Sequence, residues 1–204
     1  MAPDLALPVA HPQRIFIIGQ SGSGKSTLAR SLGEALHLPA TDLDLVYRAG
    51  GGNGPLREVA VRDADLARIA ASDAWIVEGI HLDGTAGLMD RADLIVWLDH
   101  VGSGRSTVRI MRRFVSGAWY EVRHQHGWRR FFRFGDYWRH LREVGGAARE
   151  ARSYASADGG GSAPVTRQQV AQRLDAYGAK VVRCATDADV AALLSRLRAS
   201  ATAR

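Results

Sequence analysis

Cysteine, lysine and long apolar runs are all scarce in this chain of 204 residues. A single cysteine, Cys184, excludes a disulfide framework and any zinc site built on several cysteines. No apolar run approaches the roughly 18–20 residues that a membrane-spanning helix needs. The first residues lack the basic start and the apolar stretch of a signal peptide. We therefore expect a soluble, cytoplasmic protein with no membrane contact.

Lysine occurs only at Lys25 and Lys180, so almost all the cations are arginines, and they are unevenly spread. Residues 103–152 hold twelve arginines and four acids, a net charge of +8, which leaves −2 for the rest of a chain whose total is +6. Such a basic block attracts polyanions: nucleoside triphosphates, phosphorylated substrates or nucleic acid.

Apolar runs of strand length recur along the chain, and stretches long enough for helices separate them. Hydrophobic residues make up 46% of the sequence, which is enough to build a core without covalent staples. Runs that are apolar on both faces are typical of a parallel sheet buried between helices. We expect strands at residues 14–18, 75–79, 94–99 and 180–184, with a shorter one within 38–43.

Helix signals fill the gaps between these runs. Residues 25–37 read as a helix that leaves the first strand, and Pro55 stands where a first helical residue is favoured. Thr166-Arg-Gln-Gln169 has the pattern of a capping box. The segment Thr186–Asp189 is expected to open a last helix with an apolar face. Strand–helix alternation from end to end predicts an α/β fold with a mostly parallel sheet.

The chain is expected to form one domain over residues 1–204. Eighty residues separate the strands at 94–99 and 180–184, far more than one crossover helix requires. The arginine-rich block lies in that gap, so we interpret residues about 103–165 as an inserted, mainly helical lid.

One motif carries chemistry. The segment from Gly19 to Ser26, GQSGSGKS, fits G-x-x-x-x-G-K-[ST] between a strand and a helix, the context of a phosphate-binding loop. Its glycines let backbone N–H groups surround a phosphate, Lys25 would reach the β- and γ-phosphates, and the Ser26 hydroxyl would ligate Mg²⁺. The cofactors expected are ATP and Mg²⁺. The predicted nucleotide-binding residues are Gly19, Gln20, Ser21, Gly22, Ser23, Gly24, Lys25, Ser26 and Thr27.

Acidic residues follow three of the expected strands: Asp42 and Asp44, then Glu78, then Asp99. Ligands of parallel sheets bind at the carboxyl ends of the strands, so all of these acids could face one crevice. We name Asp42 and Glu78, with Ser26, as candidate magnesium ligands, and leave open which acid serves the metal. The alternative for each acid is a helix cap or a solvated loop residue.

Several elements in order resemble a known family. The succession IIGQSGSGKSTLARSLGEALHLP, LDLVY, WIVEG and RADLIVWLD resembles adenylate-kinase-like P-loop kinases, and most closely the DNA topology modulation (FlaR-type) proteins. The resemblance covers about residues 14–145 and the last strand and helix. It implies a three-layer α/β/α P-loop fold with a five-stranded sheet in the order 2-3-1-4-5, as in nucleoside-monophosphate and shikimate kinases.

The resemblance also implies residue roles. Asp44 matches the acid at the acceptor site, and Asp42 completes a D-x-D pair of the shikimate-kinase type. If the acceptor is an alcohol, Asp44 would orient or deprotonate its hydroxyl; if the acceptor is a phosphate, Asp44 would be a ligand of the substrate or of a metal-bound water. Arg109 and Arg113 match an R-x-x-x-R pair at the base of the lid, in which the first arginine packs on the adenine and the second contacts phosphates. Lys25, Asp44 and Arg113 are therefore the candidate catalytic residues.

The acceptor region departs from the adenylate kinase pattern. Where those enzymes have D-G-F-P-R, this chain has E-G-I-H-L, residues 78–82, without the proline and the phosphate-binding arginine. This argues against a standard AMP acceptor and favours a smaller or less phosphorylated one. The predicted substrate residues are Asp44, Arg48, Glu78 and His81.

The sequence thus predicts a kinase that moves the γ-phosphate of MgATP to a small-molecule or nucleotide acceptor. The choice between ATP and GTP and between monomer and homodimer stays open. The alternative is a nucleic-acid-associated P-loop ATPase or regulator, favoured by the +8 block and its interleaved aromatic residues. Trp128, Phe132 and Trp138 also fit the buried stripe of a helix, so a nucleic-acid partner ranks second.

Overall fold

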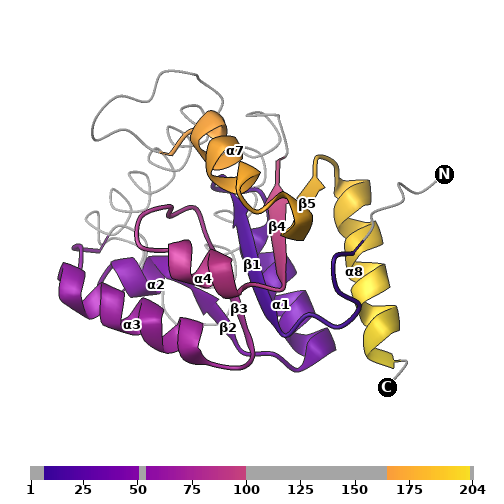
Figure 1. Ribbon diagram of the computed structural model, residues 1–204, viewed down its shortest axis with the longest axis horizontal. Helices are drawn as coiled ribbons and strands as arrows, with labels where there is room; N and C mark the ends of the chain where they lie inside the picture. Colours follow the sequence, from indigo (N-terminus) through magenta and orange to yellow (C-terminus); the bar gives the residue numbers. More distant parts are fainter. Residues whose placement is uncertain (1–6, 51–53, 100–164, 203–204) are drawn as a thin grey trace, which may run out of the picture.

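Five parallel strands form a single sheet in the order β2-β3-β1-β4-β5 (Figure 1). The computed structural model describes residues 7–50, 54–99 and 165–202. The strands are β1 (Arg14–Gly19), β2 (Ala40–Asp42), β3 (Trp75–Gly79), β4 (Leu94–Leu98) and β5 (Val181–Cys184). Both the parallel sheet and the 2-3-1-4-5 order expected from the resemblance are confirmed, and β1 lies at the centre.

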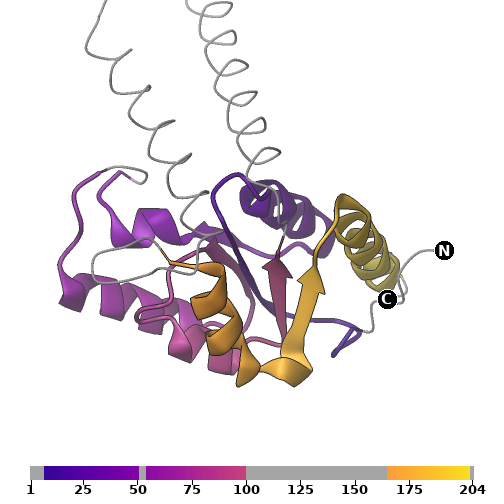
Figure 2. The same ribbon diagram turned by 90° about the horizontal axis from the view of Figure 1, so that it is seen from above.

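Helices cover both faces of this sheet. They are α1 (Lys25–Leu36), α2 (Leu43–Tyr47), α3 (Val59–Ala71), α4 (Ala86–Arg91), α7 (Arg167–Asp175) and α8 (Asp187–Thr202). Seen from above, α1 and α8 lie on one side of the strands, and α3, α4 and α7 lie on the other (Figure 2). The arrangement is a three-layer α/β/α architecture.

The sequences of β1, β3 and β4 are apolar at almost every position because these strands are buried on both faces of the sheet. In β1, Ile15 and Ile17 pack toward α1 and α8, whereas Phe16 and Ile18 pack into the cluster on the opposite face, and all four side chains are fully buried. Successive side chains of a strand alternate between faces, so a strand between two helix layers has no polar side. Each fully buried isoleucine contributes about 1.5–3 kcal/mol to folding.

The capping signals in the last third of the chain are confirmed. The Thr166 hydroxyl accepts a hydrogen bond from the Gln169 backbone, and the Gln169 side chain accepts one from the Thr166 backbone at 2.8 Å. At the start of α8, Thr186 and Asp189 exchange the same pair of bonds. These bonds satisfy backbone N–H groups that a helix start leaves unpaired. Among the described residues, no helix is both long and apolar enough to cross a membrane.

The helix expected from Pro55 begins later, at Val59. Residues 55–57 are not helical, because they pair with the chain at the end of α2. Ala49 donates to the Pro55 carbonyl, Arg57 donates to the Tyr47 carbonyl, and Leu56 bridges to Arg48. Backbone groups engaged in this antiparallel contact are unavailable for a helical turn. The expected lid at 103–165 lies almost wholly outside the described residues.

Candidate functional site

The phosphate-binding loop, residues 19–26, leaves the carboxyl end of the central strand and enters α1. Gly22 and Gly24 have φ angles of +75° and +97°, a region that glycine enters without strain. At Gly19 a Cβ atom would lie 2.7 Å from the Leu98 carbonyl oxygen, so only glycine fits between β1 and β4. Backbone geometry thus accounts for all three glycines of the motif.

The amino end of α1 is open to an anion. Its N-cap is Gly24, which has no capping side chain, and no acidic residue stands in the first turn. The first N–H groups of a helix carry a partial positive charge and need partners. Ser23 adds a further donor: its hydroxyl is buried and has no hydrogen-bond partner among the described residues. Unpaired donors around an uncapped helix start fit the phosphates of a nucleotide.

Lys25, the first residue of α1, folds back over this loop. Its Nζ donates a hydrogen bond to the Gln20 carbonyl at 3.1 Å. Its positive charge also acts on Asp44 and Glu78: the contribution of Lys25 lowers the pKa of each carboxyl group, whatever the net shift. Lys25 therefore lies near the loop, near Glu78 at the carboxyl end of β3 and near Asp44, which follows β2.

Glu78 is a buried carboxyl group whose negative charge has little direct neutralisation among the described residues. It is only 5% exposed and receives a hydrogen bond from the Ser26 side chain. Burial raises its pKa above the ordinary value, and the neighbouring acids Asp42 and Asp44 add to this, while Lys25 and Ser26 oppose it. Under-neutralised carboxylates are common where a ligand supplies the missing charge.

Ser26 and Glu78 are the pair that fits Mg²⁺. Both are oxygen ligands, and Mg²⁺ typically takes one or two protein oxygens together with nucleotide phosphates and water. The described part of the chain holds no group of three or more His, Cys, Asp or Glu side chains placed to hold a metal ion. Asp42 lies beside Glu78 in the β2–β3 register. One oxygen of Asp42 is already engaged as the N-cap of α2, where it accepts the Asp44 N–H at 2.9 Å.

Asp44 and His81, two predicted substrate residues, contact each other. His81 Nε2 lies 2.9 Å from Asp44 Oδ1. This hydrogen bond is the main reason that the pKa of Asp44 lies below its ordinary value; burial opposes it, and the charges of Lys25 and Arg48 assist it. About half of the Asp44 side chain is exposed (49%). Asp44 is therefore a charged, accessible carboxylate at the mouth of the site.

Arg48, the remaining predicted substrate residue, ends α2 close to Asp44. Its guanidinium donates to the Gly54 carbonyl at 2.9 Å. This hydrogen bond links the end of α2 to Gly54. The charge of Arg48 also helps to lower the pKa of Asp44. Arg109 and Arg113, expected near the nucleotide, lie outside the described residues.

Asp99 does not lie with the other acids of the candidate site. Its side chain is fully buried, and its oxygens accept hydrogen bonds at 2.7 Å from Arg167 and Arg183. Both guanidinium groups also lie over the Trp97 ring, at 5.6 and 5.2 Å from its centroid. The expectation that Asp99 faces the same crevice as Glu78 is wrong, because Asp99 shares the α7 face of the sheet with Trp97.

The sequence reasoning missed three residues that shape the site or its neighbourhood. Tyr47 stacks on His81, and Arg167 and Arg183 neutralise Asp99. The LDLVY element did contain Tyr47, but its apolar spacing gave no sign of a contact with a loop 34 residues away. Nothing in the local sequence links Arg167 or Arg183 to Asp99.

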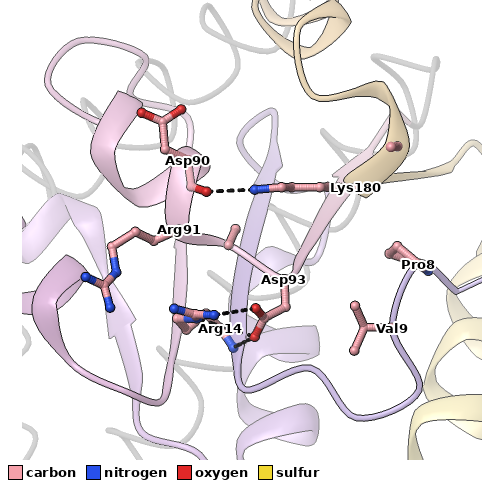
Figure 3. Close-up of a pocket in the computed structure, with 9 residues that line it drawn as sticks. Pro8, Val9, Arg14, Asp90, Arg91, Asp93 and Lys180 are labelled. Carbon is pink, nitrogen blue, oxygen red and sulfur yellow. Dashed lines mark hydrogen bonds and ion pairs between the residues drawn. The ribbon is translucent and has the colours of Figure 1, made fainter.

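A cavity of about 510 Å³ lies at the other end of the sheet (Figure 3). It is lined by the beginnings of β1, β4 and β5, including Arg14, Asp93 and Lys180. Arg14 pairs with Asp93, and Lys180 donates to the Asp90 carbonyl. Its cations are thus largely engaged within the protein, and it is remote from the phosphate-binding loop, which follows the opposite end of β1.

Sequence comparison finds one curated relative over part of the chain. No protein-family model matches. A stretch of 67 residues is 33% identical to a shikimate kinase of Rhodopirellula baltica. The match covers 33% of this chain and 35% of that protein, so the chain spans about a third of the length of the curated relative that it matches.

Solved structures with a similar course of the chain include three that are described as kinases and an uncharacterised protein from Eubacterium ventriosum, which is 10% identical with a TM-score of 0.42 over 94% of this chain and 99% of that one. A gluconokinase from Sinorhizobium meliloti is 15% identical, with a TM-score of 0.46 over 94% of this chain and 93% of that one. A shikimate kinase from Aquifex aeolicus is 14% identical, with a TM-score of 0.32 over 66% and 82%. A shikimate kinase from Acinetobacter baumannii, solved with shikimate, is 16% identical, with a TM-score of 0.36 over 82% and 94%.

Proposed function

We propose that the protein is an ATP-dependent kinase that moves the γ-phosphate of MgATP to a hydroxyl group of a small-molecule acceptor. The observation that carries the proposal is the convergence of three features at the carboxyl ends of β1, β2 and β3. An uncapped phosphate-binding loop, the Ser26–Glu78 pair and the exposed carboxylate of Asp44 all lie within the electrostatic reach of Lys25.

The chain's own groups would hold the nucleotide through the loop. The free N–H groups at the start of α1 and the unpaired Ser23 hydroxyl would bind phosphate oxygens. Lys25 would exchange its bond to the Gln20 carbonyl for the β- and γ-phosphates. Ser26 and Glu78 would hold Mg²⁺, which neutralises negative charge on the phosphates when it is bound with ATP.

Asp44 would act on the acceptor. Asp44 is ionised at neutral pH, as an aspartate with an ordinary or a lowered pKa is. It would accept a hydrogen bond from a hydroxyl and take up its proton as the hydroxyl oxygen bonds to the γ-phosphorus and the bond from that phosphorus to ADP breaks. A carboxylate at this position favours an alcohol over a phosphate acceptor, because it would repel a second phosphate group. The same reasoning supports an acceptor that is less phosphorylated than AMP.

The test is acceptor-dependent release of ADP. The purified protein is incubated with MgATP and single acceptors drawn from nucleosides, nucleoside monophosphates, sugars, amino acids, shikimate and gluconate. One acceptor is expected to raise ADP release well above the rate with ATP alone, and GTP in place of ATP settles the donor. An ADP rate that no hydroxyl compound raises would refute a kinase of this class.

The second candidate is a nucleic-acid-associated ATPase or regulator of the DNA topology modulation type. The observation that favours it is the net charge of +8 in residues 103–152. If that block binds a nucleic acid, the affinity should fall steeply between about 50 and 200 mM salt, because each phosphate contact releases counterions. Weak binding without sequence preference, together with acceptor-dependent ADP release, favours the kinase.

A further inference from the structure

We propose that His81 is a positioning residue for Asp44, and that the plane of the His81 ring is set by Tyr47, so that only one oxygen of Asp44 is left to meet the acceptor hydroxyl. The proposal rests on the proposed kinase function and deepens it. His81 then acts through Asp44, in contrast to the expectation that it lines the acceptor pocket and contacts the substrate itself.

The direction of the His81 hydrogen bond follows from the chemistry of its partner. An ionised carboxylate can only accept, so Nε2 of His81 must donate its proton to Oδ1 of Asp44 across their 2.9 Å separation. The neutral ring then carries its proton on Nε2 rather than Nδ1. Among the described residues, Oδ2 of Asp44 accepts no hydrogen bond, and the side chain is 49% exposed.

Tyr47 holds the histidine ring in one orientation. The two rings stack with centroids 3.9 Å apart and planes 4° from parallel. Tyr47 itself has little freedom: it is 4% exposed, its hydroxyl donates to the Asp83 carbonyl, and the Arg62 guanidinium lies 5.1 Å from its ring centroid. A ring fixed against a buried partner directs Nε2 along one line, and that line ends at Asp44.

The loop that carries His81 is fixed as well. Thr85 is fully buried, and its hydroxyl is 3.1 Å from the His81 carbonyl and 3.0 Å from the Leu82 carbonyl. On the other side, the backbone N–H of Asp44 donates to Asp42. Both members of the pair are therefore held by their own backbones, and the side-chain hydrogen bond joins two rigid points. Catalytic groups supported in this way reach their working geometry without reorganisation.

A matched pair of variants separates positioning from substrate contact. His81→Phe keeps the stack on Tyr47 and loses the donor; His81→Gln keeps a donor near the Nε2 position and loses the ring. With the best acceptor, we expect His81→Phe to lower kcat about 10-fold or more with little change in the acceptor KM. We expect His81→Gln to recover only part of that loss, because it restores a donor without the stack on Tyr47. His11→Phe, at an exposed histidine, is the control. A raised acceptor KM at unchanged kcat would overturn the proposal in favour of direct substrate contact.

The double variant gives the sharper test. In an Asp44→Asn background, His81→Phe should change kcat by less than about twofold, because a positioning residue has no effect once the group that it positions is gone. Equal losses in both backgrounds would overturn the proposal. If the wild-type protein transfers no phosphate to any acceptor, the proposed function fails. If the wild type is active and His81→Phe has the same kcat, the role of His81 is refuted while the kinase function stands.

A readout without turnover uses ¹⁵N NMR of the His81 ring. We expect the proton on Nε2 in the free protein and a clear shift of that nitrogen in Asp44→Asn. A ring that carries its proton on Nδ1, or that is unchanged by Asp44→Asn, would refute the pairing whatever the fate of the kinase proposal.

Discussion

Glu78 and Asp99 occupy equivalent places in the sequence, each directly at or after the end of a buried parallel strand, and the fold treats them in opposite ways. Asp99 is fully buried and is bound by two arginines through three hydrogen bonds of 2.7 Å. Glu78 is almost as buried, but its direct partner is the neutral Ser26 hydroxyl, with Lys25 assisting only through its charge. Among the described residues, two guanidinium groups neutralise Asp99, whereas no cation binds Glu78 directly.

The face of the sheet accounts for the difference. Glu78 is in register with Ile17, whose side chain packs toward α1, so the carboxyl group meets the helix that begins with Lys25 and Ser26. Asp99 follows Trp97 by two residues and shares its face, where Arg183 of β5 and Arg167 of α7 lie. The chemistry is therefore expected at Glu78 and its neighbours, whereas Asp99 ties β4 to β5 and α7.

The largest effect is expected from Lys25→Ala. Within the described residues, Lys25 is the cation that acts on both the loop and the two acids. Its loss should reduce turnover more than about 100-fold, since it removes charge stabilisation of the transferring phosphate. Stability should change little, because the lysine's hydrogen bond within the described part of the chain is a single one to the Gln20 carbonyl. Steady-state ADP release and thermal unfolding measure the two effects.

Lys180→Ala is the matched control, as Lys180 is the second of the two lysines and also donates to a backbone carbonyl, that of Asp90. It should leave turnover unchanged. An unaltered rate in Lys25→Ala would show that the loop does not bind the reacting phosphates.

Asp44→Asn should lower kcat at least about 100-fold, because asparagine keeps the size of the side chain but accepts no proton. Asp73→Asn, at an exposed acid before β3, serves as the control. The kcat of both variants is measured at saturating acceptor. A loss smaller than about threefold for Asp44→Asn would move the role to Asp42 or Glu78.

Asp99→Asn should affect stability rather than chemistry. It leaves two guanidinium groups without their buried counter-charge, which costs about 2–4 kcal/mol; the low end applies here, since both arginines are partly exposed. Urea unfolding should show this loss, while ADP release at 25 °C stays within about threefold of wild type. Undiminished stability with lost turnover would mean that Asp99, too, belongs to the site.

The smallest effect is a pH-dependent gain in stability for Glu78→Gln. The pKa of Glu78 is raised in the folded protein, so the neutral form is favoured there, and its stabilising effect is lost as the pH rises from about 4.5 through the folded pKa. The glutamine variant should match the wild type in urea unfolding at pH 4 and exceed it at pH 8. A variant that is less stable at pH 8 would contradict an under-neutralised Glu78.

The sequence was sufficient to predict the sheet and the loop because both depend on local patterns. Strand order followed from the resemblance, and the Thr166 capping box and the open α1 start are local hydrogen-bonding features. The start of α3 at Val59 could not be predicted, because the pairing of Leu56 with Arg48 is a tertiary contact.

Contacts across the chain limited what could be predicted of the site. The stack of Tyr47 on His81 joins α2 to the loop after β3, and the pairing of Asp99 with Arg167 joins residues 68 positions apart. Their places at the ends of predicted strands, together with the comparison with the adenylate kinase pattern, identified Asp44, Glu78 and His81 as functional candidates. Which of them contact one another, and which face Asp99 takes, became visible only in the folded chain.

The most direct test of a phosphoryl transfer centred on Lys25, Glu78 and Asp44 is ³¹P NMR of the reaction mixture. The protein, MgATP and the acceptor with the highest ADP release are followed until half of the ATP is consumed. We predict a phosphomonoester resonance equal in amount to the ADP formed, and neither signal above background in Lys25→Ala. Inorganic phosphate in place of the ester, formed at the same rate by Asp44→Asn, would contradict the account.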